Sequence, residues 1–213
     1  MKLLLTSGGL TNETLRNTFK ELTNKPRVSF ILTASLVEPG DKSWLFKDVQ
    51  ALYELGAEAV DLLDIACLGP SELAKRLEWS NCLFVEGGNT AYLMHCFKKS
   101  GLINMLPKLL TNKLYVGVSA GSMIMGYRLP IEVGNLLYAE DSYVRYNVTE
   151  LLGFRDFIVV PHFEAEQGVV TPELLTRIKQ ETGKPVYALD DQSALLFEDT
   201  NVTVLSEGRW EKA

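Results

Sequence analysis

The chain has 213 residues, of which 46% are hydrophobic and 23% are charged, so it can bury one substantial core, and we expect a single α/β domain over residues 1–213. Its formal net charge is -6 and no long run of lysine or arginine occurs, which argues against a nucleic-acid-binding surface. Three cysteines lie far apart, without the spacing of metal ligands, and are interpreted as core residues of a reduced protein: Cys67, Cys82 and Cys96.

Apolar segments typical of strands alternate with amphipathic segments typical of helices. The first, Lys2–Thr6, is too short for the apolar part of a signal peptide, and no later run reaches the roughly 18 apolar residues of a membrane span, so a cytoplasmic protein without membrane contact is expected. Further strands are expected at 28–33, 57–63, 82–85, 114–118, 157–160, 186–189, 194–197 and 202–205. Helices are expected at 12–22, 41–55, 71–79, 91–99 and from 122 onward, with Thr11 or Asn12 and Ser71 as N-caps.

This alternation predicts a mostly parallel sheet with helices on both faces. The closely spaced late strands predict an antiparallel extension of that sheet. In open sheets of this kind ligands bind beyond the carboxyl ends of the strands. The loops that follow the predicted strands are therefore the places to look for a functional site.

The loop after the strand at 114–118 contains a serine among small residues, in the run Gly117-Val118-Ser119-Ala120-Gly121. A serine between a strand and a helix in such a run is typical of a nucleophile elbow, where a tight turn exposes the hydroxyl. The N–H of Ala120 would then point toward a developing oxyanion at the start of the helix. The alternative is that the small residues only let the helix pack closely.

A serine nucleophile needs a base, and the chain has two histidines. His162 follows an apolar strand that ends at Pro161, so it lies at the edge where Ser119 also lies, and the two residues are expected to meet there. His95 falls inside a predicted helix and is interpreted as a structural residue. His162 is therefore the candidate base.

Two glycine turns follow other predicted strands. In Glu86-Gly87-Gly88-Asn89-Thr90 a backbone N–H is suited to be the second oxyanion donor or to bind an anion, and Gly88 is favoured over Gly87. The turn at 6–10 is interpreted as a tight connection. Neither turn has the glycine spacing of a nucleotide site, and no metal or organic cofactor is expected.

Three motifs together resemble those of the peptidase E family of serine peptidases, which includes the cyanophycinases: Gly87-Gly88-Asn89-Thr90, Gly117-Val118-Ser119-Ala120-Gly121 and Pro161-His162-Phe163. The resemblance spans most of the chain. It implies a flavodoxin-like three-layer sandwich similar to class I glutamine amidotransferases and, in the best-known member, release of an N-terminal aspartate from dipeptides. By position it implies Ser119 as nucleophile, His162 as base, and Gly88 with Ala120 as oxyanion donors.

The third member of the triad is less well defined. Family members carry an acidic residue either after the elbow helix, where this chain has Asn135, or at the end of a late strand, where it has Asp190 and Asp191. The acid must accept a hydrogen bond from one imidazole nitrogen so that the other faces the serine. We favour Asp191, with Asp190 and Asn135 as alternatives, although aspartates at such a place also suit a turn.

The resemblance does not extend to the recognition of aspartate. The aspartate-specific relative uses an arginine after its histidine, whereas this chain has Thr171-Pro172-Glu173 there and Arg177 only further on. Strict N-terminal aspartate specificity is therefore not expected. The acidic run at 164–166 is either a binding site for a free amino terminus or a solvated surface.

We therefore expect acyl transfer on short peptides, without a cofactor and with a homodimer as a possible assembly. An esterase or acyltransferase would share the same elbow and base. A non-catalytic module that binds a small anion at the glycine turns is the remaining alternative.

Overall fold

A central sheet of seven strands organises the protein in the computed structural model, which describes residues 1–127, 145–146, 148, 150–163 and 170–213. The strand order is β3-β2-β4-β5-β1-β8-β9. Parallel pairing joins the first five of these, and β8 and β9 add an antiparallel extension beside β1, as the sequence predicted. The bounds are β1 Lys2–Thr6, β2 Arg27–Ile31, β3 Ala59–Leu63, β4 Cys82–Val85, β5 Leu114–Val118, β8 Ser193–Glu198 and β9 Asn201–Ser206.

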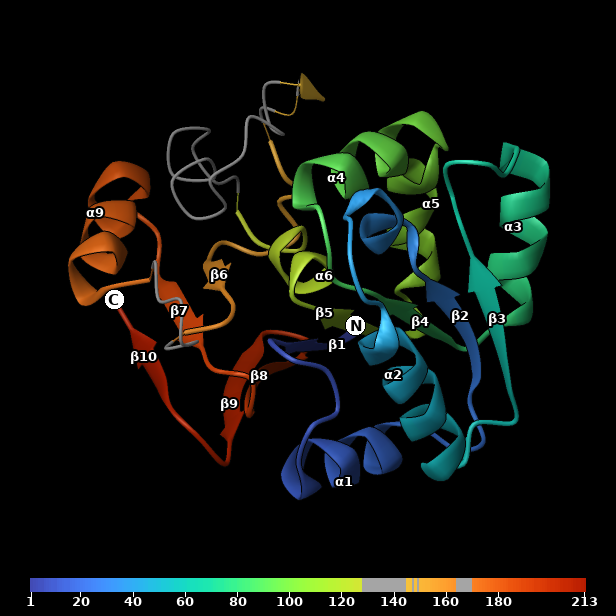
Figure 1. Ribbon diagram of the computed structural model, residues 1–213, viewed down its shortest axis with the longest axis horizontal. Coiled ribbons are helices and arrows are strands. Elements are labelled where there is room, and N and C mark those ends of the chain that lie inside the picture. The colour runs from blue at the N-terminus through green and yellow to red at the C-terminus, as the bar shows by residue number, and fades with distance from the viewer. Residues whose placement is uncertain (128–144, 147, 149, 164–169) are drawn as a thin grey trace.

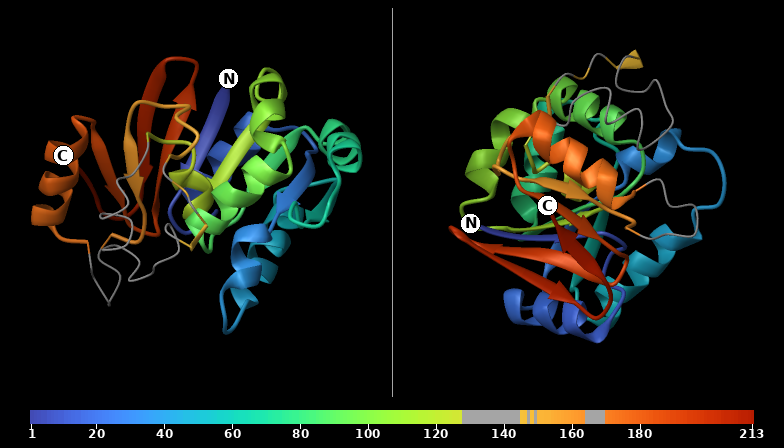
Figure 2. Two further views of the ribbon diagram at one scale, coloured as in Figure 1. Left: turned by 90° about the horizontal axis from the view of Figure 1, so that it is seen from above. Right: turned by 90° about the vertical axis from the view of Figure 1, so that its left-hand side faces the viewer.

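Helices cover both faces of this sheet and give three layers (Figures 1 and 2). In β1 the side chain of Leu4 packs with α1 (Glu13–Leu22) and α2 (Ser43–Glu54), whereas Leu3 and Leu5 point to the other core. That second core is closed by α3 (Pro70–Trp79), α4 (Thr90–Lys99), α5 (Leu102–Leu109) and the short α6 (Ala120–Met123). The predicted α/β class and mostly parallel sheet are confirmed.

A second, three-stranded sheet lies beside the first, and the sequence did not predict it. Its order is β10-β7-β6, with bounds Trp210–Lys212, Val186–Leu189 and Ile158–Val160, and α9 (Pro172–Thr182) packs on β7 (Figure 1). The expectation that all late strands extend one sheet was therefore wrong for β6 and β7. The rings of Phe157 and Phe197 stack with centroids 4.7 Å apart, so an apolar contact joins the two sheets.

Several element ends differ from the sequence expectation. Asn12 is the N-cap of α1 and accepts a hydrogen bond from Leu15 N, but α3 begins at Pro70 after Gly69, so Ser71 is not a cap. Proline suits the first turn of a helix because it lacks an N–H. The elbow helix begins at Ala120, two residues earlier than expected. Both α5 and β10 form without having been predicted from the sequence.

None of the described helices is long and apolar enough to span a membrane.

Candidate active site

Ser119 directly follows β5 and has a strained backbone conformation, with φ 46° and ψ -107°. A β-carbon on Gly121 would lie 2.0 Å from the carbonyl oxygen of Val85, and one on Gly117 would lie 2.7 Å from the backbone of Gly121. Only glycine fits at these two positions, since the turn brings backbone against backbone. The local sequence therefore forces a sharp strand-to-helix turn with the serine at its apex.

His162 follows β6 and meets Ser119 from the second sheet. Its Nε2 lies 2.9 Å from Oγ of Ser119, and its Nδ1 lies 2.7 Å from Oδ1 of Asp191, which follows β7. His162 also has a positive φ of 58°, which is unusual for a residue other than glycine. The structure thus brings together the three side chains that the sequence singled out. They meet where the ends of two sheets converge, and not on one sheet edge as expected.

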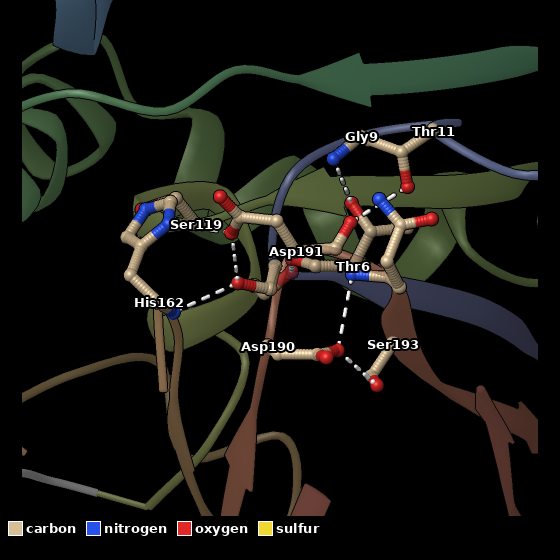
Figure 3. Close-up of polar contacts among 11 residues, drawn as sticks. Thr6, Gly9, Thr11, Ser119, His162, Asp190, Asp191 and Ser193 are labelled. Carbon is tan, nitrogen blue, oxygen red and sulfur yellow. Dashed lines mark hydrogen bonds and ion pairs between the residues drawn. The ribbon is translucent and has the colours of Figure 1, made fainter. Parts of the chain in front are cut away.

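The two neighbouring aspartates have different surroundings, and Figure 3 shows their carboxylates pointing apart. Oδ1 of Asp190 accepts the N–H of Gln192 at 3.0 Å and its Oδ2 accepts the N–H of Arg209, so Asp190 closes the turn between β7 and β8. The hydrogen bond with His162 lowers the pKa of Asp191 below its usual value and outweighs the opposing effect of burial. Asn135 lies outside the described residues.

Ser7 supports this arrangement from the end of β1. Its hydroxyl donates to Oδ1 of Asp191 at 2.8 Å and accepts the backbone N–H of His162 at 2.8 Å. The turn at 6–10 was interpreted only as a tight connection, and this was wrong because Ser7 is buried between the base and the acid. The position of Ser7 after the first strand could have indicated its role. Because β1 pairs in parallel with β5, Ser7 and Ser119 follow their strands at the same edge of the sheet.

The glycine loop after β4 lies directly beside Ser119. A β-carbon on Gly87 would be 3.2 Å from Cβ of Ser119, and the N–H of Gly87 donates to Oε2 of Glu86 at 2.9 Å. Gly88 has φ 126° and lies against the backbone of Ala34. Within the described part of the chain, the N–H groups of Gly88 and Ala120 donate no hydrogen bond. Both are therefore free to act as donors to a ligand.

A cleft of about 350 Å³ opens over these residues. Ser119, His162 and Asp191 line it together with Ser7, Gly88, Trp44 and Asp48. A larger hollow of about 450 Å³ lies at the opposite ends of β1 and β5 and contains none of the site residues. Size alone would therefore select the wrong place, and the side-chain chemistry selects the cleft.

Comparison with known families gives one match over most of the chain: the model of Peptidase family S51 matches residues 3–205. The chain belongs to peptidase family S51. The sequence resemblance to peptidase E is thereby confirmed, and this S51 protein is a serine-type peptidase, as expected.

Known relatives of this S51 peptidase are similar over most of their length. It is 31% identical over 152 residues to the uncharacterized peptidase Lmo0363 of Listeria monocytogenes, which covers 68% of this chain and 72% of that protein. It is 26% identical over 176 residues to the uncharacterized peptidase PM1590 of Pasteurella multocida, covering 79% of this chain and 80% of that protein.

Solved structures agree with this assignment. A Listeria monocytogenes protein assigned to peptidase E superposes with a TM-score of 0.77 at 27% identity, over 97% of this chain and 98% of that one. A peptidase from an acI-B1 actinobacterium shares the fold, with a TM-score of 0.70 at 18% identity over 98% of this chain and 88% of that one.

The remaining sequence candidates lie away from the cleft of the S51 peptidase or outside the described residues. His95 is on α4 with its ring 5.7 Å from that of Tyr146, and Arg177 is on α9, paired with Glu181. Cys82 and Cys96 are buried as expected, and burial raises the pKa of Cys82 to about 12, but Cys67 is exposed and is not a core residue. The acidic run at 164–166 falls outside the described residues.

Proposed function

We propose that this S51 peptidase hydrolyses short peptides with Ser119 as nucleophile, His162 as general base and Asp191 as the residue that orients His162. One observation carries the proposal: His162 lies 2.9 Å from Ser119 Oγ on one side of its ring and 2.7 Å from Asp191 Oδ1 on the other. This is the arrangement by which an imidazole accepts the proton of a serine while its other nitrogen keeps its hydrogen on a carboxylate.

In the first half of the proposed reaction the Ser119 hydroxyl attacks the carbonyl carbon of the peptide bond. His162 Nε2 takes the serine proton as the C–O bond forms, and the negative charge moves to the carbonyl oxygen. The free N–H groups of Gly88 and Ala120 are the proposed donors to that oxyanion. His162 then gives the proton to the leaving amine as the C–N bond breaks, which leaves an acyl group on Ser119.

In the second half water takes the place of the amine. His162 removes a proton from the water as it attacks the ester carbonyl, and the same two N–H groups receive the oxyanion. Collapse of this intermediate returns the proton from His162 to Ser119 and releases the carboxylic acid. The nucleophile elbow serves both halves because it holds the serine oxygen in one position.

The cleft favours small substrates without an essential acidic side chain. Its volume of about 350 Å³ is near the lower end of ordinary ligand pockets. No lysine or arginine is among the described residues that line it, so the bidentate partner that an aspartate side chain would need is missing from that part of the wall. We therefore propose short-peptide or dipeptide hydrolysis without strict aspartate specificity.

Cleavage of a dipeptide and short-peptide library, with aryl esters in parallel, tests the proposal. The expected result is peptide cleavage that falls by several orders of magnitude in Ser119→Ala and in His162→Ala. Turnover of esters without any cleavage of peptides would favour the esterase alternative. Peptide cleavage by Ser119→Ala at the wild-type rate would refute the mechanism.

A further inference from the structure

One of the residues that line the cleft is acidic and is not used by the proposed reaction. We propose that Asp48 is the cation-binding residue of the cleft and holds a free ammonium group of the substrate beside Ser119. This inference rests on the proposed function for the location of the scissile bond. The inference adds two things to the proposed function: Asp48 as a residue that determines specificity, and an ammonium group as the part of the substrate that it binds.

Asp48 and Trp44 have side chains of the kinds that bind an ammonium group: a carboxylate and an indole ring. They lie one turn apart on α2, which places both on the same face of the helix, and both line the cleft that contains Ser119. A β-carbon on Gly9 would be 2.7 Å from Oδ1 of Asp48, so the carboxylate lies against the backbone of the first glycine turn. A carboxylate next to an indole ring favours a cation through charge and through the ring face.

A second carboxyl group stands behind Asp48. Glu86 is fully buried, its Oε2 accepts the N–H of Gly87, and its carboxyl group interacts with that of Asp48. Its Oε1 has no hydrogen-bond partner among the residues that the structure describes. No ion pair found in the described ranges involves Asp48, and the described wall has no lysine or arginine. The pair therefore lacks a counterion from this part of the protein.

Burial affects the ionisation of the two carboxyl groups to different extents. Burial raises the pKa of Glu86 well above its usual value, and the neighbouring carboxyl group of Asp48 adds to the rise, so the protonated form of Glu86 is favoured. Burial also raises the pKa of Asp48, to about 6, and the hydrogen bond with Glu86 opposes that rise. Asp48 is thus the group of the pair that ionises more readily. A largely desolvated anion without a partner favours binding of a cation that arrives with the substrate.

The position of the pair relative to the nucleophile suits an α-ammonium group. Glu86 directly precedes Gly87, which abuts Ser119, so Glu86 belongs to the oxyanion loop, and Asp48 reaches the same cleft from α2. In a peptide the α-ammonium group is two bonds from the carbonyl carbon of its own residue. A substrate whose first carbonyl is attacked by Ser119 therefore carries its ammonium group close to that atom. A lysine as the first residue of the substrate could also supply an ammonium group, through its side chain.

The test compares Asp48→Asn with Glu58→Gln, a matched control that removes one exposed carboxylate outside the cleft. The substrates are the dipeptide cleaved fastest in the library, its N-acetyl form, and an N-acetyl dipeptide that begins with lysine. We expect Asp48→Asn to lower kcat/KM for the free-amine dipeptide about 10- to 100-fold, mainly through KM. For the acetylated form we expect little change, and Glu58→Gln should match wild type on all three.

A binding measurement separates this inference from the proposed reaction. The boronic acid analogue of alanine and its N-acetyl form are titrated calorimetrically into wild type, Asp48→Asn and, should that variant fail to fold, Trp44→Leu. If wild type binds the free amine more tightly than the N-acetyl form and the variant does not, the result supports an ammonium site at Asp48. A preference for the lysine peptide alone, lost in Asp48→Asn, would support the site with the side-chain ammonium as its ligand. An unchanged free-amine preference in the variant, or equal binding of the free and acetylated analogues to wild type, overturns it, whereas full activity of Ser119→Ala overturns only the proposed mechanism.

Discussion

Ser119 and His162 approach within 2.9 Å although they end strands of two different sheets. Neither sheet alone contains the candidate triad, so the distance between nucleophile and base depends on how the sheets pack. The stacked rings of Phe157 and Phe197 are a direct apolar contact between them, at a centroid distance of 4.7 Å.

Loosening that contact should therefore affect activity from a distance. We expect Phe157→Leu to lower the free energy of unfolding by about 1 kcal/mol, because the substitution conserves most of the buried volume. It should also lower kcat severalfold, since a small displacement of a reacting group slows the chemistry. Urea denaturation and peptide kinetics measure the two effects. An unchanged kcat at reduced stability would show that the sheet contact does not position the triad.

Asp191 and Asp190 should respond differently to the same change. Asp191→Asn removes the negative charge beside His162 Nδ1, and its amide group can donate to Nδ1 and hold the wrong tautomer, so we expect kcat to fall by about 10²- to 10⁴-fold at nearly unchanged stability. Asp190→Asn keeps an acceptor oxygen in the turn and should retain most of kcat. Steady-state kinetics and thermal unfolding of both variants show which of the two aspartates orients His162. A greater loss of kcat in Asp190→Asn would reverse the assignment.

Ser7 should prove necessary although it touches no reacting atom. Ser7→Ala leaves the partly buried N–H of His162 without its acceptor and Asp191 without one donor. We expect the free energy of unfolding to fall by about 1–3 kcal/mol and kcat to fall about tenfold. A variant that unfolds earlier yet retains full kcat would limit Ser7 to a structural role.

Gly88→Ala tests the glycine loop. A β-carbon there would lie 2.4 Å from the backbone of Ala34 at a φ of 126°, so the loop must move. We expect kcat to fall about 10²- to 10³-fold, as for loss of an oxyanion donor. Gly183→Ala is the matched control, because Gly183 also has a positive φ, of 66°, but open space around it. That control should lose about 1 kcal/mol of stability and keep its activity.

The raised pKa of Asp48 predicts how stability changes with pH. Its pKa is about 6 in the folded state, whereas an unfolded aspartate titrates at about 3.9, so the folded protein binds more protons between these values. This group therefore lowers stability as pH rises from about 4 to about 6, and the full penalty is present above that range.

Asp48→Asn removes this penalty. We expect the variant to be more stable than wild type by ~1–3 kcal/mol at pH 8 and to show no such gain at pH 3.5, where Asp48 is neutral in both states. Denaturant unfolding at the two pH values measures the difference. Equal stability of the two proteins at pH 8 would contradict the burial argument.

The elements of the central sheet were largely predictable from the sequence, but the division into two sheets was not. β1, β4, β5 and β7 have the bounds that their apolar runs predicted. The run at 186–189 looks the same whether it joins the central sheet or leaves it, because periodicity reports burial and not the pairing partner. Sequence therefore placed Ser119 and His162 after strands correctly but assigned both strands to one sheet.

Within the site, residues on loops after strands were easier to find than residues on helices. Asp190 and Asp191 are adjacent, and only the direction of each side chain distinguishes the one that reaches His162 from the one that closes a turn. Asp48 had no signal at all, since a single acidic residue within an amphipathic helix usually faces solvent.

The close backbone contacts at Gly117, Gly121 and Gly88 leave little room to redesign this enzyme at its centre. Any side chain added there would collide with main-chain atoms before it reached a substrate. Trp44 and Asp48, by contrast, project from α2 and belong to neither the proposed oxyanion loop nor the triad. Laboratory evolution toward new peptide preferences should therefore begin with libraries at these two helix positions.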